Sequence, residues 1–234
     1  MRPVYPILAL LASGLLLAAG CGGGPPAPAD AAVETGAPPR EAPAPEDTRG
    51  PLVVFLGDSL TAGLGLSEDQ AFPALLGRRL REAGTPVRVV NAGVSGDTTT
   101  GGLSRLPWLL QQNPDVLVVG LGANDALRGQ SLDAIEDNLR AIVERGTAAG
   151  VPVLLLGMRV PTNYGPDYAE GFATLYRRLA KSLGVELVPF LLDGVGGHPQ
   201  LNQPDGIHPT ARGQEIVADN VLPHLKRVLA KLPR

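Results

Sequence analysis

The chain has 234 residues, a formal net charge of −3 and a single cysteine, Cys21. Its 20 basic residues form no basic block and are not interleaved with aromatic side chains, so we expect no nucleic-acid partner. A lone cysteine cannot form an internal disulfide. The sequence contains neither a Cys, His and carboxylate cluster with metal-ligand spacing nor a glycine-rich phosphate loop, so we predict no metal site and no cofactor.

Residues 1–20 are predicted to be a signal peptide. Arg2 gives a positive start, and residues 7–19 are an almost unbroken apolar run that is too short to span a bilayer. The small residues before Cys21 resemble a bacterial lipobox, in which the cysteine is lipidated after cleavage. Ala18 stands where that pattern prefers leucine. The alternative is an ordinary cleavable signal peptide with an incidental cysteine.

Residues 21–50 are predicted to be the lipidated cysteine and a disordered tether. Residues 22–50 carry 7 Pro, 7 Ala and 5 Gly without hydrophobic periodicity, so they cannot bury enough apolar area to fold. Gly22, rather than Asp, follows the cysteine, which predicts an outer-membrane anchor facing the periplasm if the bacterium has two membranes. The remainder, residues 51–234, has a suitable length for one domain, which we expect to act as a monomer.

Five runs rich in apolar and β-branched residues predict buried strands within residues 51–234. Their hydrophobicity is continuous rather than alternating, which is typical of parallel strands covered on both faces. The runs are 52–56, 87–91, 115–120, 152–157 and 185–189.

Amphipathic stretches lie between these strands. Ser67 and Gln70 form a capping box before the first helix, and Ser131 opens the second. A third carries apolar residues over 172–183, and Thr210 is an N-cap candidate for the last. The alternation predicts an α/β fold of three α/β/α layers around a doubly wound parallel sheet, with ligands bound beyond the carboxyl ends of the strands.

Ser59 is the candidate nucleophile, because it follows the first strand in the run Gly57-Asp58-Ser59-Leu60. A serine hydroxyl needs a base that takes its proton. The run is not a nucleophile elbow, since Thr61 stands where that motif has its second glycine. The alternative role of Ser59 is a helix N-cap. We expect Asp58 to bond backbone N–H groups at the helix start rather than to take part in catalysis.

Of the three histidines, His208 is the candidate base. Asp205 stands three residues before it, a spacing that lets the carboxylate reach Nδ1 while Nε2 faces the serine. A structural Asp–His turn contact is the alternative. His224 is expected to be a surface or packing residue of the last helix, and His198 has no acidic partner close in sequence.

Two further segments offer hydrogen-bond donors for a developing oxyanion. Gly93 follows the second strand and can present its backbone N–H, and Asn124 follows the third strand and can present its side-chain amide. The N–H of Ser59 is a third donor. Both segments can equally be plain strand-to-helix turns, because Gly, Asn and Asp are common turn residues.

These segments resemble the SGNH (GDSL) hydrolase superfamily in order and spacing, and the resemblance covers about residues 52–230. Within it, the chain is similar to the bacterial multifunctional thioesterase I/lysophospholipase L1/arylesterase subfamily. The matching segments are Gly57-Asp58-Ser59-Leu60, residues 91–99, 103–107, 124–129, 161–165 and 205–209. The resemblance implies a flavodoxin-like fold, Ser59 as nucleophile, His208 as base, Asp205 as its orienting partner, and an oxyanion hole of Ser59, Gly93 and Asn124.

The sequence therefore predicts a serine esterase that hydrolyses acyl esters, and also thioesters, of small-molecule or lipid substrates through an acyl-enzyme. Met158, Tyr164 and Ile207 are candidates for an acyl pocket, with ordinary packing as the alternative role. We interpret Trp108 as a packed anchor. Two other functions remain open. One is a carbohydrate O-acetylesterase or acetyltransferase of the same superfamily, and the other is a non-catalytic binding lipoprotein.

Overall fold

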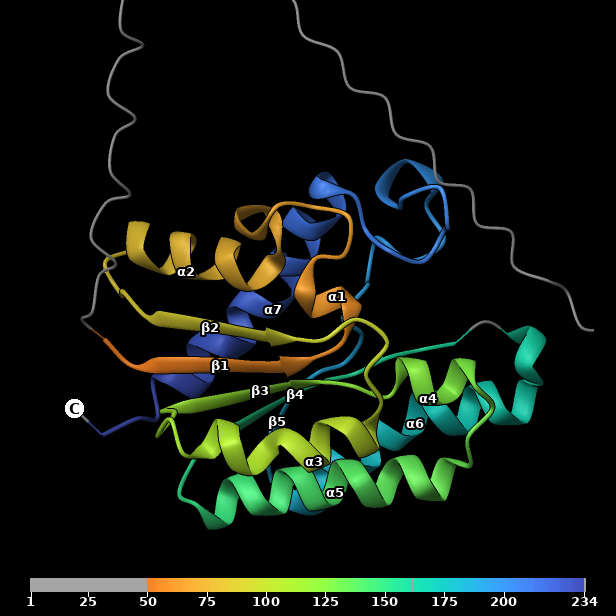
Figure 1. Ribbon diagram of the computed structural model, residues 1–234, viewed down its shortest axis with the longest axis horizontal. Coiled ribbons are helices and arrows are strands. Elements are labelled where there is room, and N and C mark those ends of the chain that lie inside the picture. Colours follow the sequence, from red (N-terminus) through yellow and green to blue (C-terminus); the bar gives the residue numbers. More distant parts are fainter. Residues whose placement is uncertain (1–49, 161, 234) are drawn as a thin grey trace, which may run out of the picture. The chain divides into compact units, whose positions relative to one another are not determined.

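The computed structural model describes residues 50–160 and 162–233 (Figure 1). The predicted signal peptide, Cys21 and the tether up to residue 49 lie outside the described residues. Five parallel strands form one sheet, and all five were predicted: β1 (Leu52–Gly57), β2 (Arg88–Gly93), β3 (Val116–Gly120), β4 (Val153–Leu156) and β5 (Glu186–Val188). Their order, β2-β1-β3-β4-β5, is that of a flavodoxin-like sheet.

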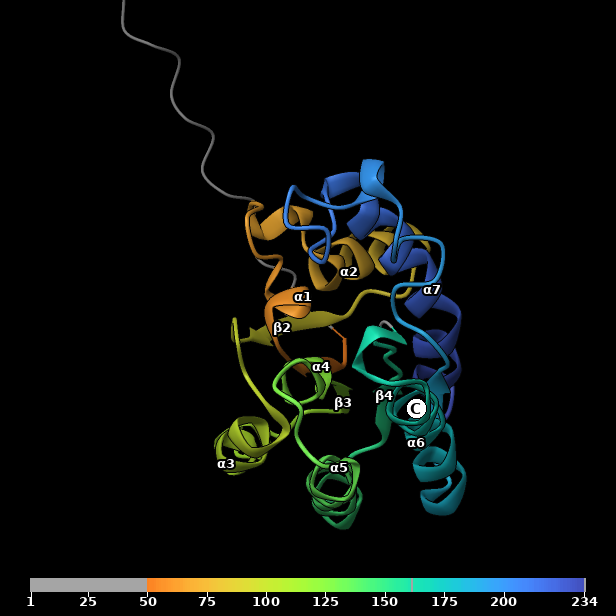
Figure 2. The same ribbon diagram turned by 90° about the vertical axis from the view of Figure 1, so that its right-hand side faces the viewer.

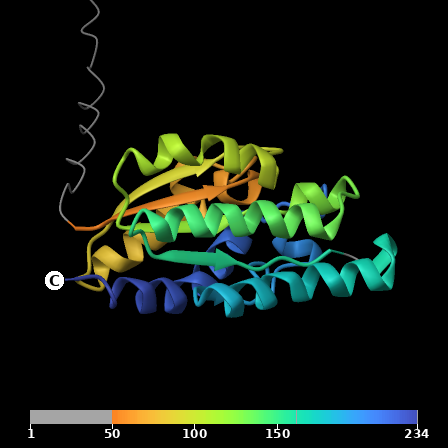
Figure 3. The ribbon, with the colours of Figure 1, turned by 90° about the horizontal axis from the view of Figure 1, so that it is seen from below.

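Helices cover both faces of the sheet (Figure 2). On one face α2 (Phe72–Glu82) packs against α7 (Ala211–Leu229). The other face is covered by α3 (Thr99–Leu110), α5 (Leu132–Ala148) and α6 (Pro166–Leu183), and Figure 3 shows α3 and α5 side by side. This arrangement confirms the predicted three layers. The shorter helical pieces are α1 (Ser59–Ala62), α4 (Ala123–Leu127), η1 (Glu68–Gln70), η2 (Thr162–Tyr164) and η3 (Pro199–Leu201).

Two helices begin at the predicted caps. The Ser131 hydroxyl accepts the N–H of Ala134 at 3.2 Å at the start of α5, and the Thr210 hydroxyl accepts the N–H of Gly213 at 3.2 Å at the start of α7. Each bond satisfies a backbone donor that the first helical turn leaves unpaired. No helix among the described residues is both long and apolar enough to cross a membrane.

The helix predicted after Ser67 begins later than expected. The Gln70 amide oxygen accepts the Ser67 N–H at 3.2 Å, but this pair brackets the short turn η1. Ala71 is then extended, with ψ 143°, and α2 starts at Phe72. The Phe72 N–H donates to the buried Gln214 of α7 at 2.9 Å, so a residue far along the chain satisfies the donor at this helix start.

Helix α3 was not predicted from the sequence. Gly101, Gly102 and Pro107 interrupt its apolar pattern, and all three are unfavourable inside a helix. Trp108 on this helix is 64% exposed, so its interpretation as a packed anchor is wrong.

Three glycines stand in register at the carboxyl edge of the sheet. Gly57, the last residue of β1, pairs with Gly93 of β2 on one side and with Gly120 of β3 on the other. A Cβ on Gly93 would lie 2.3 Å from the backbone nitrogen of Ala62, and one on Gly57 would lie 2.0 Å from the hydroxyl of Thr61. The missing side chains therefore let α1, with Ser59 as its first residue, lie directly on the strand ends.

We expect Gly93→Ala to be strongly destabilising, because its methyl group would meet the α1 backbone, which cannot turn away as a flexible side chain can. Overpacking of this kind costs about 1–3 kcal/mol, and here we expect the upper end. The Tm should fall by several degrees, and activity should fall with it because α1 carries Ser59.

The control is Gly146→Ala, the same change inside α5. Its Cβ would lie 3.1 Å from a methyl group of Val153 and 3.3 Å from one of Leu117. Side chains can adjust there, and alanine is favoured over glycine in a helix by about 1 kcal/mol. If thermal unfolding showed that the two variants are equally stable, it would contradict the close packing of α1 on the strand ends.

Candidate active site

Ser59, His208 and Asp205 form a continuous hydrogen-bonded relay. His208 Nε2 lies 2.9 Å from Ser59 Oγ, and His208 Nδ1 lies 2.7 Å from Asp205 Oδ2. Ser59 is buried at the carboxyl end of β1, whereas the Asp205 side chain is 46% exposed. The structure thus brings together three residues that the sequence separates by as many as 149 positions.

The loop before α7 holds Asp205 and His208 in place. The Gly206 N–H donates to the carbonyl of Gln203 at 2.8 Å, which closes a tight turn around Asp205. The Gln203 N–H donates to the carbonyl of His208 at 2.7 Å, and its side-chain amide donates to the carbonyl of Leu64 at 2.7 Å. The loop is therefore fixed both to itself and to the segment that follows α1.

Asp205 and Asp58 have opposite electrostatic environments. The N–H of His208, then its ring, then the N–H of Ile207 lower the pKa of Asp205 from 3.8 to about 2, so it is ionised at neutral pH. Burial raises the pKa of Asp58 from 3.8 to about 6, against the lowering effects of the Leu60 N–H and of His208. The predicted local role of Asp58 is confirmed, because its Oδ1 accepts the Leu60 N–H at 3.0 Å.

Gly93 does not reach the site, which corrects the prediction that its N–H serves as an oxyanion donor. Its N–H donates to the side chain of Asn91 at 3.0 Å, and its missing side chain makes room for α1. Gly96, three residues further along the chain, instead lines the cavity onto which Ser59 and His208 open. Within residues 50–160 and 162–233, neither the N–H of Gly96 nor that of Ser59 has a hydrogen-bond acceptor. The only sequence signal for this donor was a glycine at or after the end of a strand, and both Gly93 and Gly96 satisfy it.

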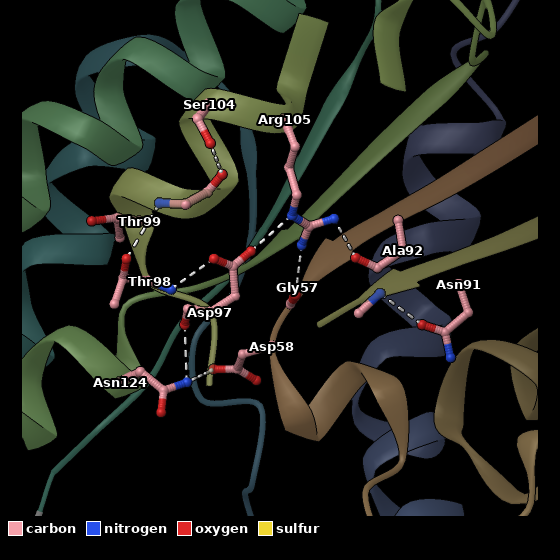
Figure 4. Close-up of polar contacts among 12 residues, drawn as sticks. Gly57, Asp58, Asn91, Ala92, Asp97, Thr98, Thr99, Ser104, Arg105 and Asn124 are labelled. Carbon is pink, nitrogen blue, oxygen red and sulfur yellow. Dashed lines mark hydrogen bonds and ion pairs between the residues drawn. The ribbon is translucent and has the colours of Figure 1, made fainter. Parts of the chain in front are cut away.

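Asn124 lies at the start of α4 and lines the same cavity, and Figure 4 shows its side-chain amide directed toward Asp97 and Asp58. Its Nδ2 donates to the carbonyl of Asp97 at 3.0 Å and to Asp58 Oδ2 at 3.3 Å. The buried carboxylate of Asp125 accepts both the N–H and the hydroxyl of Thr99, at 2.9 and 2.6 Å. This second pair ties α4 to the start of α3 and so fixes the amide of Asn124.

A cavity of about 470 Å³ opens onto Ser59, His208, Asn124 and Gly96. Its other walls are largely apolar. They include Met158 and Ile207, which were predicted, and Leu64, Leu127, Val160, Phe190 and Leu192, which were not. Tyr164 is not part of the wall; it is 38% exposed and its hydroxyl lies 3.5 Å from the carbonyl of Leu127. That placement corrects its assignment to the pocket.

The other two histidines lie outside this cavity wall. His224 Nδ1 lies 2.9 Å from Glu186 Oε1 in a surface cluster on α7 and β5, which agrees with the prediction of a surface or packing residue. His198 borders a second cavity beside Pro199 and Gln203, which adjoins the first and shares Gly197, Asn202 and Gly206 with it. Among the described residues, no three His, Cys, Asp or Glu side chains are grouped as metal ligands.

Residues 55–216 match the family model described as GDSL-like lipase/acylhydrolase. The chain belongs to this family. It is 46% identical over 178 residues to the protein named esterase TesA of Pseudomonas aeruginosa, a match that covers 76% of the chain and 89% of the relative. It is 44% identical over 168 residues to the thioesterase 1/protease 1/lysophospholipase L1 of Escherichia coli K12, with 71% and 79% covered.

A crystal structure of TesA has the same fold, with a TM-score of 0.73, 45% identity, and 76% of this chain and 99% of that chain covered. The predicted superfamily, subfamily and flavodoxin-like fold are thus confirmed. As a GDSL-family acylhydrolase the chain is an enzyme that hydrolyses carboxylic esters, which confirms the predicted enzyme class.

We expect Asp58→Asn to change the pH dependence of stability. Because the pKa of Asp58 is about 6 in the folded protein against an ordinary 3.8, folding binds a proton between these values. The contribution of this proton uptake to the stability of the folded protein is complete below pH 3.8 and is lost as the pH rises through 6. It amounts to about 3 kcal/mol. The variant does not ionise, so relative to the parent it should gain about that much between about pH 3.5 and 8.

Urea unfolding of both proteins across this range measures the trend. The lost carboxylate contacts shift the difference by a nearly constant amount, so its slope with pH is the readout. The control is Asp137→Asn, at an exposed carboxylate on α5. A stability difference for Asp58→Asn that stays flat with pH would contradict the raised pKa.

Proposed function

We propose that Ser59, His208 and Asp205 carry out ester hydrolysis through an acyl-enzyme. The observation that carries the proposal is the relay of 2.9 and 2.7 Å contacts that ends at a serine facing an apolar cavity. His208 Nε2 takes the proton of Ser59 as the hydroxyl attacks the carbonyl carbon, and it then protonates the leaving group. Water repeats the sequence on the acyl-serine. The ionised Asp205 keeps the proton on Nδ1 and stabilises the imidazolium.

The tetrahedral intermediate carries its negative charge on the former carbonyl oxygen. We assign its stabilisation to the N–H groups of Ser59 and Gly96 and to the side-chain amide of Asn124. In support, both N–H groups lack an acceptor among the described residues, and all three residues line the same cavity. Donors held in place before the reaction need no reorganisation as charge develops, which makes them effective in catalysis. The longer of the two amide contacts, 3.3 Å to Asp58, is the one that an oxyanion would replace.

The substrate we propose is an acyl ester or thioester with a medium-length chain, including lysophospholipids. Apolar side chains dominate the cavity wall, and Leu64, Leu127 and Ile207 are 44%, 40% and 49% exposed there. Such a wall favours a hydrocarbon chain over a sugar, whose hydroxyl groups would need many polar partners. The names of the relatives, esterase and thioesterase/lysophospholipase, agree with this choice.

The test compares Ser59→Ala with Ser95→Ala, a second serine in the cavity wall. We expect kcat of Ser59→Ala to fall by at least about 10³-fold, because among the described residues no hydroxyl other than that of Ser59 contacts the His208 ring. Ser95→Ala should retain most of its activity. If Ser59→Ala hydrolysed esters at near the parent rate, the proposed mechanism would be wrong.

The acyl preference is measured with p-nitrophenyl acetate, butyrate, octanoate and laurate, followed by octanoyl thioester and lysophosphatidylcholine. Serine-dependent rates that rise toward the medium chains support the lipid-like substrate. Hydrolysis of acetate alone would instead support the carbohydrate O-acetylesterase, and no hydrolysis at all would support the binding protein.

We further propose that the enzyme is exported, lipidated at Cys21, held at the periplasmic side of an outer membrane, and active as a monomer. The support is the lipobox-like segment and Gly22 after the cysteine. In a two-membrane host, we expect the parent to partition into detergent and the outer-membrane fraction, and Cys21→Ser into the soluble fraction. Ser59→Ala is the control and should partition like the parent. An unmodified N-terminal cysteine in the mass spectrum would contradict lipidation.

A further inference from the structure

Arg105 joins the chain segments at Gly57, Ala92 and Asp97 (Figure 4). It lies on α3, and its NH2 group donates to the carbonyl of Gly57 at 2.8 Å while its NH1 group donates to that of Ala92 at 2.6 Å. Its Nε donates to Asp97 Oδ2 at 2.7 Å. Gly57 is two residues before Ser59, Ala92 is close to the end of β2, and Asp97 follows Gly96. One guanidinium group therefore connects the segments that carry Ser59 and Gly96.

Asp97 extends this connection to Asn124. Its Oδ2 accepts the Nε–H of Arg105, and its Oδ1 accepts the Thr98 N–H at 3.0 Å. Its backbone carbonyl accepts the side-chain amide of Asn124 at 3.0 Å. The orientation of that amide consequently depends on the position of Asp97, and the position of Asp97 depends on its ion pair with Arg105. All three donors of the proposed oxyanion hole are linked to this side chain through two or three covalent or hydrogen-bonded steps.

Only arginine suits this position. The planar guanidinium presents donors in fixed directions, so it can reach a carboxylate and two carbonyls together, whereas a lysine ammonium is a point charge on a flexible stem. The side chains of Arg105 and Asp97 are 23% and 11% exposed, so these charge-assisted bonds compete little with water. Arg105 does not line the cavity, which excludes direct contact with a substrate held there.

We propose that Arg105 is a positioning residue that sets the geometry of the oxyanion hole by holding the loop 94–98 against the ends of β1 and β2. This inference rests on the proposed function of Ser59, Gly96 and Asn124. A shift of about 1 Å in catalytic groups can cost roughly 10²-fold in rate. Arg105→Gln should therefore lower kcat by about 10- to 100-fold with little change in KM, because the cavity walls that bind the acyl chain are untouched.

A matched control separates positioning from general stability. Arg79 on α2 makes an ion pair of the same length, 2.7 Å to Asp219, and its side chain is 25% exposed. Arg79→Gln should leave kcat unchanged. Titration with a fluorophosphonate counts the molecules whose Ser59 reacts, so kcat is expressed per active site and a loss of folded protein does not mimic the effect. A kcat of Arg105→Gln equal to that of the parent per active site would overturn the inference.

Two further variants test the route of the effect. Arg105→Lys should recover most of the thermal stability through its charge pair with Asp97 but not the lost kcat; recovery of both would contradict the role of the guanidinium fork. In an Asn124→Ala background, Arg105→Gln should lower kcat by a smaller factor than it does in the parent, because one of the three donors that Arg105 positions is already lost. Fully multiplicative losses would contradict the route from Arg105 through Asp97 to Asn124. These results are informative only if Ser59→Ala is inactive, so failure of the proposed function is recognised separately.

Discussion

The active site depends on how closely α1 lies on the carboxyl edge of the sheet. Gly57, Gly93 and Gly120 stand in one row there, and none has a side chain that would hold the helix away. Asn91 adds to this contact, because its amide donates to the carbonyl of Thr61 at 2.9 Å while its oxygen accepts the Gly93 N–H. On the other side of α1, the buried Gln214 donates to the carbonyl of Leu60 at 3.1 Å. Ser59 is thus fixed from the sheet and from α7, and the loop that carries His208 is tied to the segment after α1 by the side chain of Gln203.

The two aspartates near Ser59 differ in their electrostatic properties because Asp205 is exposed and Asp58 is buried. Asp205 is exposed and accepts two N–H groups and an imidazole, so it is an anion without loss of stability and can orient His208. Asp58 is almost fully buried, and desolvation keeps its pKa about two units above the ordinary value, at about 6. Because that value lies below neutral pH, Asp58 is still mostly ionised there, and its carboxylate accepts the Leu60 N–H and the side-chain amide of Asn124. The two carboxylates are therefore not interchangeable, although both lie close to the same serine and histidine.

Much of this arrangement could be predicted from the sequence. Continuous apolar runs such as 52–56 predict buried parallel strands because few other structures bury every residue of a run, and parallel order then brings Ser59 and Asn124 to one edge. The short spacing from Asp205 to His208 predicts their contact because a single turn connects them. What the sequence could not resolve was register. Gly93 and Gly96 follow the same strand, and only the pairing of Gly93 with Gly57 shows which of them lies under α1 and which faces the cavity.

Helix α3 was missed for a related reason. Gly101 and Gly102 weaken any helix signal, yet a Cβ on Gly101 would lie 1.8 Å from Asp97 Oδ1 and one on Gly102 would lie 2.2 Å from a methyl group of Leu121. The two glycines let α3 approach both the loop 94–98 and the segment that leads into α4. Without that approach, Arg105, one helical turn further on, would not reach the ends of β1 and β2. Close contacts between backbone segments thus require residues that carry little pattern of their own, so the features that assemble the site are the ones that periodicity detects least.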